Sequence, residues 1–225
     1  EDIPGIPGSE GRNVIREWGD QELLLKEFED NAKGLNENDR NSLLERTFGG
    51  INIAFHIRSM DDSHLPLRHG EILVDQRANS FDGYSFRIGR VDFKSDSKIF
   101  ILPQMSALQK YKIIKKSVEV SKKTPEELGY DARYWNCNDL ALEILACAIP
   151  ELKERLESFK LMQKRYLEDI METRARESYI PFPPPLTNSR NKLLFTSSTD
   201  AISILKEIGF KEITVKEWQE QVHLK

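Results

Sequence analysis

Cysteine is scarce in this chain of 225 residues, which has only Cys137 and Cys147. The pattern around both predicts a helix, in which ten intervening steps would separate them by about 15 Å, far beyond the reach of a disulfide. Without disulfides, the sequence favours a reducing compartment, and we expect a cytoplasmic protein. Two cysteines and four histidines without ligand spacing also argue against a metal site, so we expect neither a metal nor a cofactor.

Long apolar runs and an excess of basic charge are missing as well. No stretch approaches the roughly 18 apolar residues of a membrane-spanning helix, so we expect no transmembrane segment. The first residues lack the basic and apolar regions that are typical of a signal peptide. With 33 basic and 37 acidic residues, the net charge is -4. This charge argues against a general polyanion binder, and we expect no nucleic-acid partner.

Hydrophobic periodicity divides the chain into three parts. Residues 1–49 are expected to form a flexible lead-in and a charged helical segment. Residues 50–149 show strand-like alternation followed by helical periodicity, and we expect them to form the core domain. Residues 150–225 are expected to be a helical extension. It would contain one long charged helix over 150–177 and a proline-rich linker at 179–186.

Most strands are predicted in the core domain, and one more is expected at 210–215, after a short helix at 200–208. Residues 51–57 alternate strictly between inward-facing and outward-facing positions, and further candidate strands follow at 69–76 and 83–91. Residues 77–82 are rich in turn-forming side chains, and we expect them to be the loop of an antiparallel hairpin. The sequence therefore predicts an α+β fold in which a small antiparallel sheet packs against helices, with helical N- and C-terminal extensions.

The strongest chemical signal lies at Cys137. Asn136 is a candidate N-cap, which would make Cys137 the first residue of a helix. A thiol at this position lies at the positive end of the helix dipole, which favours the nucleophilic thiolate. Cys137 also begins the apolar stripe of the predicted helix and would face the sheet, whereas Cys147 is expected to be an ordinary core residue. On helix phase alone, Cys137 could equally be a small buried residue without reactivity.

A base for this thiol has to come from a histidine, and three of the four histidines precede Cys137. His69 begins a predicted strand, where the neighbouring Gly70 leaves room for another segment to approach closely. His56 lies on the polar face of the first strand and His64 in a polar loop, and we expect both to be surface or capping residues. His69 is therefore the candidate base.

Three segments in this order resemble a known family. They are His-Gly-Glu-Ile-Leu-Val at 69–74, Phe-Arg-Ile-Gly-Arg-Val-Asp at 86–92 and Trp-Asn-Cys-Asn-Asp-Leu-Ala at 135–141. Together they resemble the permuted papain-like fold of NlpC-like, lecithin:retinol-acyltransferase-like and PPPDE-type proteins, and they are especially similar to uncharacterised fungal NlpC-like domains. In these families the histidine precedes the cysteine. The resemblance covers residues 50–149.

The resemblance implies a cysteine-dependent hydrolase, such as a thiol protease or isopeptidase, or an acyltransferase. Its target would be an amide, isopeptide, thioester or ester bond in a protein or acyl-carrying substrate. Cys137 would attack the carbonyl carbon, and His69 would transfer protons. The helix start, capped by Asn136 and including the backbone amide of Cys137, would hold the oxyanion.

A third residue that would orient His69 has two candidates. Glu71 lies two residues along the same strand face, about 7 Å away, and Ser85 is expected on the partner strand. Asp75 shares the face but lies roughly 20 Å away, which is too far. Arg87 stands where the acyltransferase-like members carry a second histidine. A fixed cation there would oppose an imidazolium unless it points away, so a catalytically inactive protein is the competing hypothesis.

In that alternative, the chain is an interaction module that keeps the papain-like fold. Residues 150–186, which comprise the long amphipathic helix and the proline-rich segment, would then bind a protein partner. A third hypothesis is an oligomer that is held together by helices. The reactivity of the two thiols separates the first two hypotheses, because only a catalytic Cys137 should react far faster than Cys147 near neutral pH.

Overall fold

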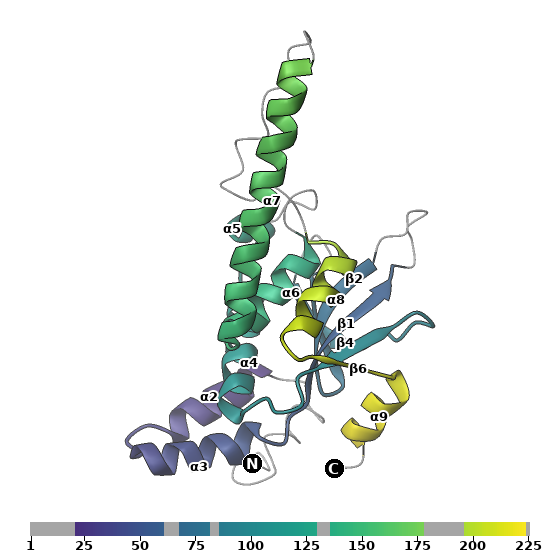
Figure 1. The fold of residues 1–225 in the computed structure, drawn as a ribbon. Helices are drawn as coiled ribbons and strands as arrows, with labels where there is room; N and C mark the ends of the chain where they lie inside the picture. The colour runs from purple at the N-terminus through teal and green to yellow at the C-terminus, as the bar shows by residue number, and fades with distance from the viewer. Residues whose placement is uncertain (1–20, 61–67, 82–85, 130–135, 178–195, 224–225) are drawn as a thin grey trace.

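A single antiparallel sheet with helices around it is the architecture of this chain (Figure 1). The computed structural model describes residues 21–60, 68–81, 86–129, 136–177 and 196–223. In chain order, its elements are α2 (Gln21–Asn31), α3 (Glu37–Phe48), β1 (Ile53–Ser59), β2 (Arg68–Val74), β3 (Arg77–Phe81), β4 (Phe86–Arg90), β5 (Lys98–Ile101), α4 (Ala107–Ser121), α5 (Pro125–Leu128), α6 (Cys137–Ala146), α7 (Pro150–Glu177), α8 (Ser198–Glu207), β6 (Lys211–Ile213) and α9 (Val215–His223). The predicted α+β class with a small antiparallel sheet is confirmed.

The sheet has six strands in the order β4-β3-β2-β1-β5-β6, and each neighbouring pair is antiparallel. Alternation along β1 assigns its side chains to two separate cores. Phe55 and Ile57 belong to the large core that helices α2, α3, α4 and α6 complete. Ala54 points to the other face, where it joins a smaller core with Leu73 and Trp218 of α9. Both faces of the central strands are therefore covered.

The hairpin turn lies earlier in the chain than the sequence predicts. Residues 77–82 were expected to be a loop, but Arg77–Phe81 form strand β3, which pairs with both β2 and β4. The turn is made by the two residues before β3, and Asp75 takes a positive φ of 49° there. Asn79, a typical turn residue, is buried in β3 because its side chain exchanges two hydrogen bonds of 2.8 and 2.9 Å with Gln21 of α2. A tertiary contact thus overrides the local preference.

The predicted helices are present, with shifts at their ends. Helix α4 begins after Ser106, whose side chain forms a capping box with Gln109. Helix α6 ends at Ala146, so Cys147 is its C-cap and is exposed. The expectation that Cys147 is an ordinary core residue is therefore wrong, because Cys147 lies one turn after Glu143, on the exposed side of the helix.

The C-terminal residues complete the sheet. Strand β6 pairs with β5 in the register Phe100↔Glu212, and α9 then covers the second face of the sheet through Trp218, which is 1% exposed. Helix α7 leaves the body of the molecule after its first turns (Figure 1). No helix formed by the described residues has the length and apolar character that crossing a membrane requires.

Replacing Trp218 with alanine should lower the free energy of unfolding by about 3–5 kcal/mol, because a fully buried indole is removed from the second core. Urea unfolding followed by circular dichroism measures this change. The matched control is Lys216→Ala in the same helix, where the side chain is 86% exposed and the expected change is below about 0.5 kcal/mol. Equal, small effects of both substitutions would show that α9 contributes nothing to the core.

Candidate active site

The start of α6 is fixed by its own side chains. Asn136 Oδ1 accepts hydrogen bonds from the backbone amides of Asn138 (3.0 Å) and Asp139 (3.3 Å), and Asp139 Oδ2 accepts one from the amide of Asn136 (3.1 Å). This capping box satisfies three of the amides that a helix start leaves without intrahelical partners. Cys137 is therefore the first residue of the helix, as the sequence predicts.

Asp139 also anchors the helix start to distant parts of the chain. Its Oδ1 accepts hydrogen bonds from Thr196 Oγ1 and from Lys160 Nζ of α7, both at 2.5 Å, and its Oδ2 accepts one from the amide of Thr196 at 3.0 Å. The carboxylate is buried, and such a group is stable only when it is hydrogen-bonded and paired with a positive charge. The position of Cys137 thus depends on two contacts made by segments beyond α6.

Strand β2 approaches the helix start at Gly70. A Cβ atom at this position would collide with Asn138 Oδ1, so only glycine allows the strand and the helix to lie this close. The recorded ladder between β2 and β3 runs from Ile72↔Asn79 to Val74↔Arg77 and does not include Gly70. The backbone N–H of Gly70 interacts with the sulfur of Cys137 and helps to lower the pKa of that thiol. The expectation that Gly70 makes room for a close approach is confirmed.

His69 and Cys137 lie beside each other, and each shifts the pKa of the other. Burial alone would lower the pKa of His69, but the hydrogen bonds and negative charges of Cys137 and Glu71 outweigh burial and raise this pKa to about 9. Burial also opposes ionisation of the thiol. The imidazolium of His69 and the backbone amides of Gly70 and Asn138 nevertheless lower the pKa of Cys137. Both shifts favour a thiolate–imidazolium pair.

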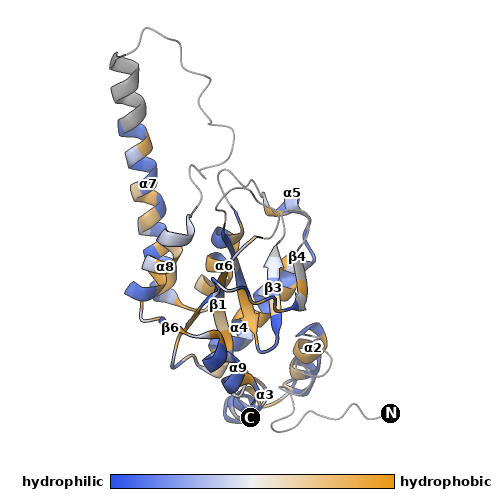
Figure 2. Cartoon of the chain, turned by 90° about the vertical axis from the view of Figure 1, so that its right-hand side faces the viewer, coloured by the Kyte–Doolittle hydropathy of each residue, from blue (hydrophilic) through white to orange (hydrophobic). Residues whose placement is uncertain are grey.

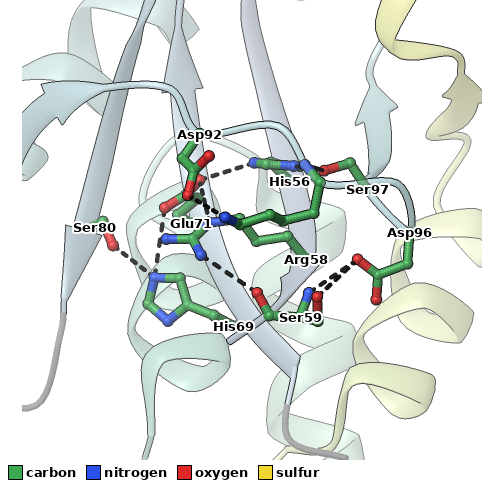
Figure 3. Close-up of polar contacts among 10 residues, drawn as sticks. His56, Arg58, Ser59, His69, Glu71, Ser80, Asp92, Asp96 and Ser97 are labelled. Atoms are coloured by element: carbon green, nitrogen blue, oxygen red, sulfur yellow. Dashed lines mark hydrogen bonds and ion pairs between the residues drawn. The ribbon is translucent and has the colours of Figure 1, made fainter. Parts of the chain in front are cut away.

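Two side chains engage the other ring nitrogen of His69 (Figure 3). Nε2 lies 2.5 Å from Ser80 Oγ of β3 and 3.5 Å from Glu71 Oε2 of β2. Because Nε2 faces these two groups, Nδ1 is the nitrogen that remains for Cys137. Glu71 is 1% exposed, and although burial would raise its pKa, the contacts with His56 and His69 hold that pKa well below its usual range.

Glu71 has further partners on β1. His56 Nδ1 lies 2.8 Å from Glu71 Oε1, and Arg58 Nε lies 3.5 Å from the same oxygen. His56 was expected to be a surface or capping residue, but it is completely buried. The expectation is wrong because β1 is a central strand, so that the polar face of β1 is covered as well as its apolar face. Figure 3 shows these side chains together with His69 and Ser80 in one cluster on the sheet.

The sequence-predicted residues meet different outcomes. Cys137, His69 and Glu71 come together, with Asn136 at the helix cap. Ser85 and His64 lie outside the described residues. The backbone of Arg87 belongs to β4, but its side chain is not described. Sequence reasoning missed Ser80, His56 and Arg58. The period-two alternation of β1 and the histidine itself were visible signals for His56. The register that places His56 and Arg58 opposite β2, and the contact between Ser80 and His69, were not visible.

The exposed Cys147 has none of the features that favour a thiolate. Its Sγ donates to Lys112 O at 3.6 Å, and partial burial against α4 raises its pKa. A groove of about 430 Å³ between α6 and α7 is lined by Asp139 and Cys147, but neither Cys137 nor His69 is among its lining residues. This groove therefore belongs to the packing of α7 and not to the thiolate–imidazolium pair.

Metal binding finds no support in the described parts of the chain, where no group of three or more histidine, cysteine, aspartate or glutamate side chains could hold an ion. Glu71 is instead surrounded by three cationic or imidazole side chains, as the distances above show. The chemistry that this arrangement offers is proton transfer and nucleophilic attack by sulfur.

Comparisons with known proteins give no match, whether with protein-family models, curated proteins or solved structures. What the site can do chemically therefore follows from its own contacts. These are a thiol at a helix start, an imidazole beside that thiol, and a buried carboxylate and a hydroxyl that both face Nε2 of the imidazole.

Gly70→Ala should separate the strand from the helix start. The new Cβ would meet Asn138 Oδ1, and we expect a loss of about 1–3 kcal/mol in the free energy of unfolding. We also expect slower alkylation of Cys137, because its amide and imidazole partners move. Gly89→Ala is the matched control, since a Cβ there meets nothing within 4 Å. If the alkylation rate of Cys137 and the free energy of unfolding are the same in both variants, the close approach at Gly70 has no importance for the site.

Glu71→Gln should lower the pKa of His69 from about 9 by at least about one unit, because a buried imidazolium loses its counter-charge. In the native protein the imidazolium should persist until the pH rises through about 9, whereas in the variant it should lose its proton at lower pH. NMR titration of the His69 ring measures both midpoints. Ser80→Ala keeps the charge and should change the midpoint less. An unchanged midpoint in Glu71→Gln would contradict the assigned role of the carboxylate.

Proposed function

We propose that this chain is a cysteine-dependent hydrolase or acyltransferase with a permuted papain-like topology, in which Cys137 is the nucleophile and His69 the acid and base. One observation carries the proposal. His69 lies beside the thiol, whose pKa it lowers, and faces a buried carboxylate, Glu71, at 3.5 Å through Nε2. A nucleophile, a base and a group that orients the base are the arrangement that activates a thiol for acyl chemistry.

The fold supports this proposal in two respects. The base lies on a strand that precedes the nucleophile in sequence, and the nucleophile begins a helix that packs on the antiparallel sheet. That order is the one implied by the resemblance to permuted papain-like proteins. The helix start adds a positive electrostatic contribution at Cys137, where the thiolate has to be stabilised.

The first half of the reaction would form a thioester. The thiolate of Cys137 attacks the carbonyl carbon of the substrate, and the carbonyl oxygen becomes an oxyanion. The amides of Asn138 and Asp139 bond to the Asn136 cap, whereas the amide of Cys137 has no intrahelical acceptor and is suited to hold the oxyanion. When the carbon–leaving-group bond breaks, the His69 imidazolium gives its proton to the departing amine, alcohol or thiol.

The second half would return the enzyme to its starting state. Neutral His69 takes a proton from water or from an acceptor nucleophile, whose oxygen, nitrogen or sulfur attacks the thioester carbon. The carbon–sulfur bond breaks, and Cys137 leaves as the thiolate beside a protonated His69. Water as the attacking group makes the chain a hydrolase, such as a thiol protease or isopeptidase, and another nucleophile makes it an acyltransferase. Glu71 stays ionised throughout and stabilises the imidazolium.

Alkylation with iodoacetamide, resolved by peptide mass spectrometry, tests the proposal. At pH 7 we expect Cys137 to react at least about tenfold faster than Cys147, because the pKa of Cys137 is lowered and that of Cys147 is raised. The alkylation rate of Cys137 should stay nearly constant as the pH falls from 9 toward 7, whereas the rate of an ordinary thiol falls over this range because its thiolate is protonated.

His69→Asn should reduce the rate at Cys137 and leave the rate at Cys147 unchanged, and Cys147→Ser is the matched control for the thiol that is not expected to act. If Cys137 is alkylated rapidly, the next experiment is to trap the nucleophile with acyl and ubiquitin-like probes that carry an electrophile. If native Cys137 reacts no faster than a free thiol, or only after unfolding, the proposal of a cysteine enzyme fails.

The exposed part of α7 favours a second candidate function, in which the chain binds a protein partner without catalysis. The first turns of α7 are docked, since Leu156 and Phe159 are buried and Arg155 forms an ion pair with Glu207 of α8. Further along, Leu161, Met162 and Tyr166 are 51%, 57% and 63% exposed. Figure 2 shows apolar segments recurring among polar ones along this projecting helix. Large apolar side chains in a solvated helix are typical of a partner-binding surface.

A photo-crosslinking residue at position 166, introduced in cells of the source organism, tests this second candidate. We expect one specific protein adduct, which should disappear when Leu161 and Met162 are both replaced by glutamate. The same crosslinker at Lys216 of α9, an exposed position on another surface, should not give that adduct. Adducts that are alike at both positions would show that α7 has no dedicated partner.

A further inference from the structure

His56 is a buried histidine that the proposed reaction leaves without a role. It lies on β1 directly opposite Glu71 on β2, and its side chain is 0% exposed. Both ring nitrogens are engaged: Nδ1 lies 2.8 Å from Glu71 Oε1, and Nε2 lies 2.8 Å from Ser97 Oγ (Figure 3). A buried polar side chain with two short hydrogen bonds has a fixed position.

The two oxygens of Glu71 are divided between the two histidines. Oε1 lies 2.8 Å from His56 Nδ1, whereas Oε2 lies 3.5 Å from His69 Nε2. Arg58 Nε also lies near Oε1, but at 3.5 Å it is too distant to be a well-formed hydrogen-bond donor. His56 therefore makes the shortest contact that holds the carboxylate, and this contact leaves Oε2 on the side of His69.

The charges around His56 favour its neutral form. On the sheet these are Arg58, Glu71 and His69, and Cys137 follows beyond His69 at the start of α6. Two cations and two anions balance in this cluster when the thiolate–imidazolium pair is formed. A protonated His56 would add a third positive charge to a buried site, where an uncompensated charge is costly.

The segment between β4 and β5 covers His56 and is compatible with the neutral form. The ring of Phe93 packs on the imidazole, with 5.5 Å between the ring centroids. Of the charges on this segment, Lys94 and Asp92 pair with each other at 3.0 Å, and Asp96 accepts hydrogen bonds from the amide and the hydroxyl of Ser59, both at 3.1 Å. Ser97 Oγ accepts a hydrogen bond from the amide of Lys94 at 2.9 Å, and its own hydrogen can point to His56 Nε2. A hydroxyl that donates to Nε2 requires that nitrogen to be unprotonated.

We propose that His56 is a positioning residue of this site. As a neutral imidazole it accepts a hydrogen bond from Ser97 at Nε2 and donates from Nδ1 to Glu71 Oε1, which holds the carboxylate so that Oε2 faces His69. The role of His56 in catalysis rests on the proposed cysteine chemistry, whereas its effect on Glu71 and His69 can be measured without any reaction. His56 does not touch a substrate and acts only through Glu71.

NMR of the ¹⁵N-labelled protein tests the proposal directly. At pH 7 the native protein should show His56 with a proton on Nδ1 and none on Nε2. His56→Leu should lower the titration midpoint of His69 by at least about one pH unit, because Glu71 loses its donor and turns away or takes up a proton. His56→Asn should stay within about 0.3 unit of the native midpoint, because the amide N–H of asparagine replaces the Nδ1 donor.

Ser97→Ala, a smaller change at a partly covered position, should shift the His69 midpoint in the same direction as His56→Leu but by less. A purely structural role of His56 would reduce stability in His56→Leu without moving the His69 midpoint in the folded fraction. An unmoved midpoint in both His56→Leu and Ser97→Ala overturns the proposal, and so does a doubly protonated His56 in the native protein. Slow alkylation of native Cys137 would instead overturn the proposed enzyme, so the two failures are distinguishable.

Discussion

A carboxylate that is only 1% exposed has to be matched by positive charge and hydrogen-bond donors, and Glu71 meets this requirement with side chains from two strands. His56 and Arg58 on β1 face one of its oxygens, and His69 on its own strand faces the other. The imidazolium of His69 is stable in a buried site because Glu71 supplies its counter-charge, and the thiolate of Cys137 is favoured because the imidazolium is there. Each charge in the cluster thus depends on the preceding one.

The fold makes this sequence of contacts possible by bringing the start of α6 against strand β2 at Gly70. At Gly70 the backbone of β2 is outside the recorded ladder with β3, and its N–H turns to Cys137. The missing side chain of Gly70 leaves the room that Asn138 occupies. The imidazole of His69 can therefore lie on the sheet with its partners on β1 and β3 and still reach a thiol on the helix that covers the other face.

Sequence patterns identified the parts of this site that depend on near neighbours. Asn136 caps the helix through residues two and three positions away, and Glu71 shares a strand face with His69 because it is two residues on. The contacts of His56 and Ser80 depend on strand register, which no local pattern contains. The strand that carries Ser80 was expected to be a loop, because the preference of its residues for turns is visible in sequence while the hydrogen bonds that Gln21 makes to Asn79 are not.

Asp139 holds Lys160 of α7 and Thr196, which precedes α8, on the same carboxylate oxygen. Two residues that lie far apart in the chain therefore meet at the same atom, and this contact closes a loop between them. The entropy of closing a loop changes only slowly with its length. A loop whose two ends are fixed can therefore be lengthened, shortened or exchanged at little energetic cost. A change in the length of the chain between Lys160 and Thr196 should therefore leave the start of α6 in place, as long as both contacts to Asp139 are kept.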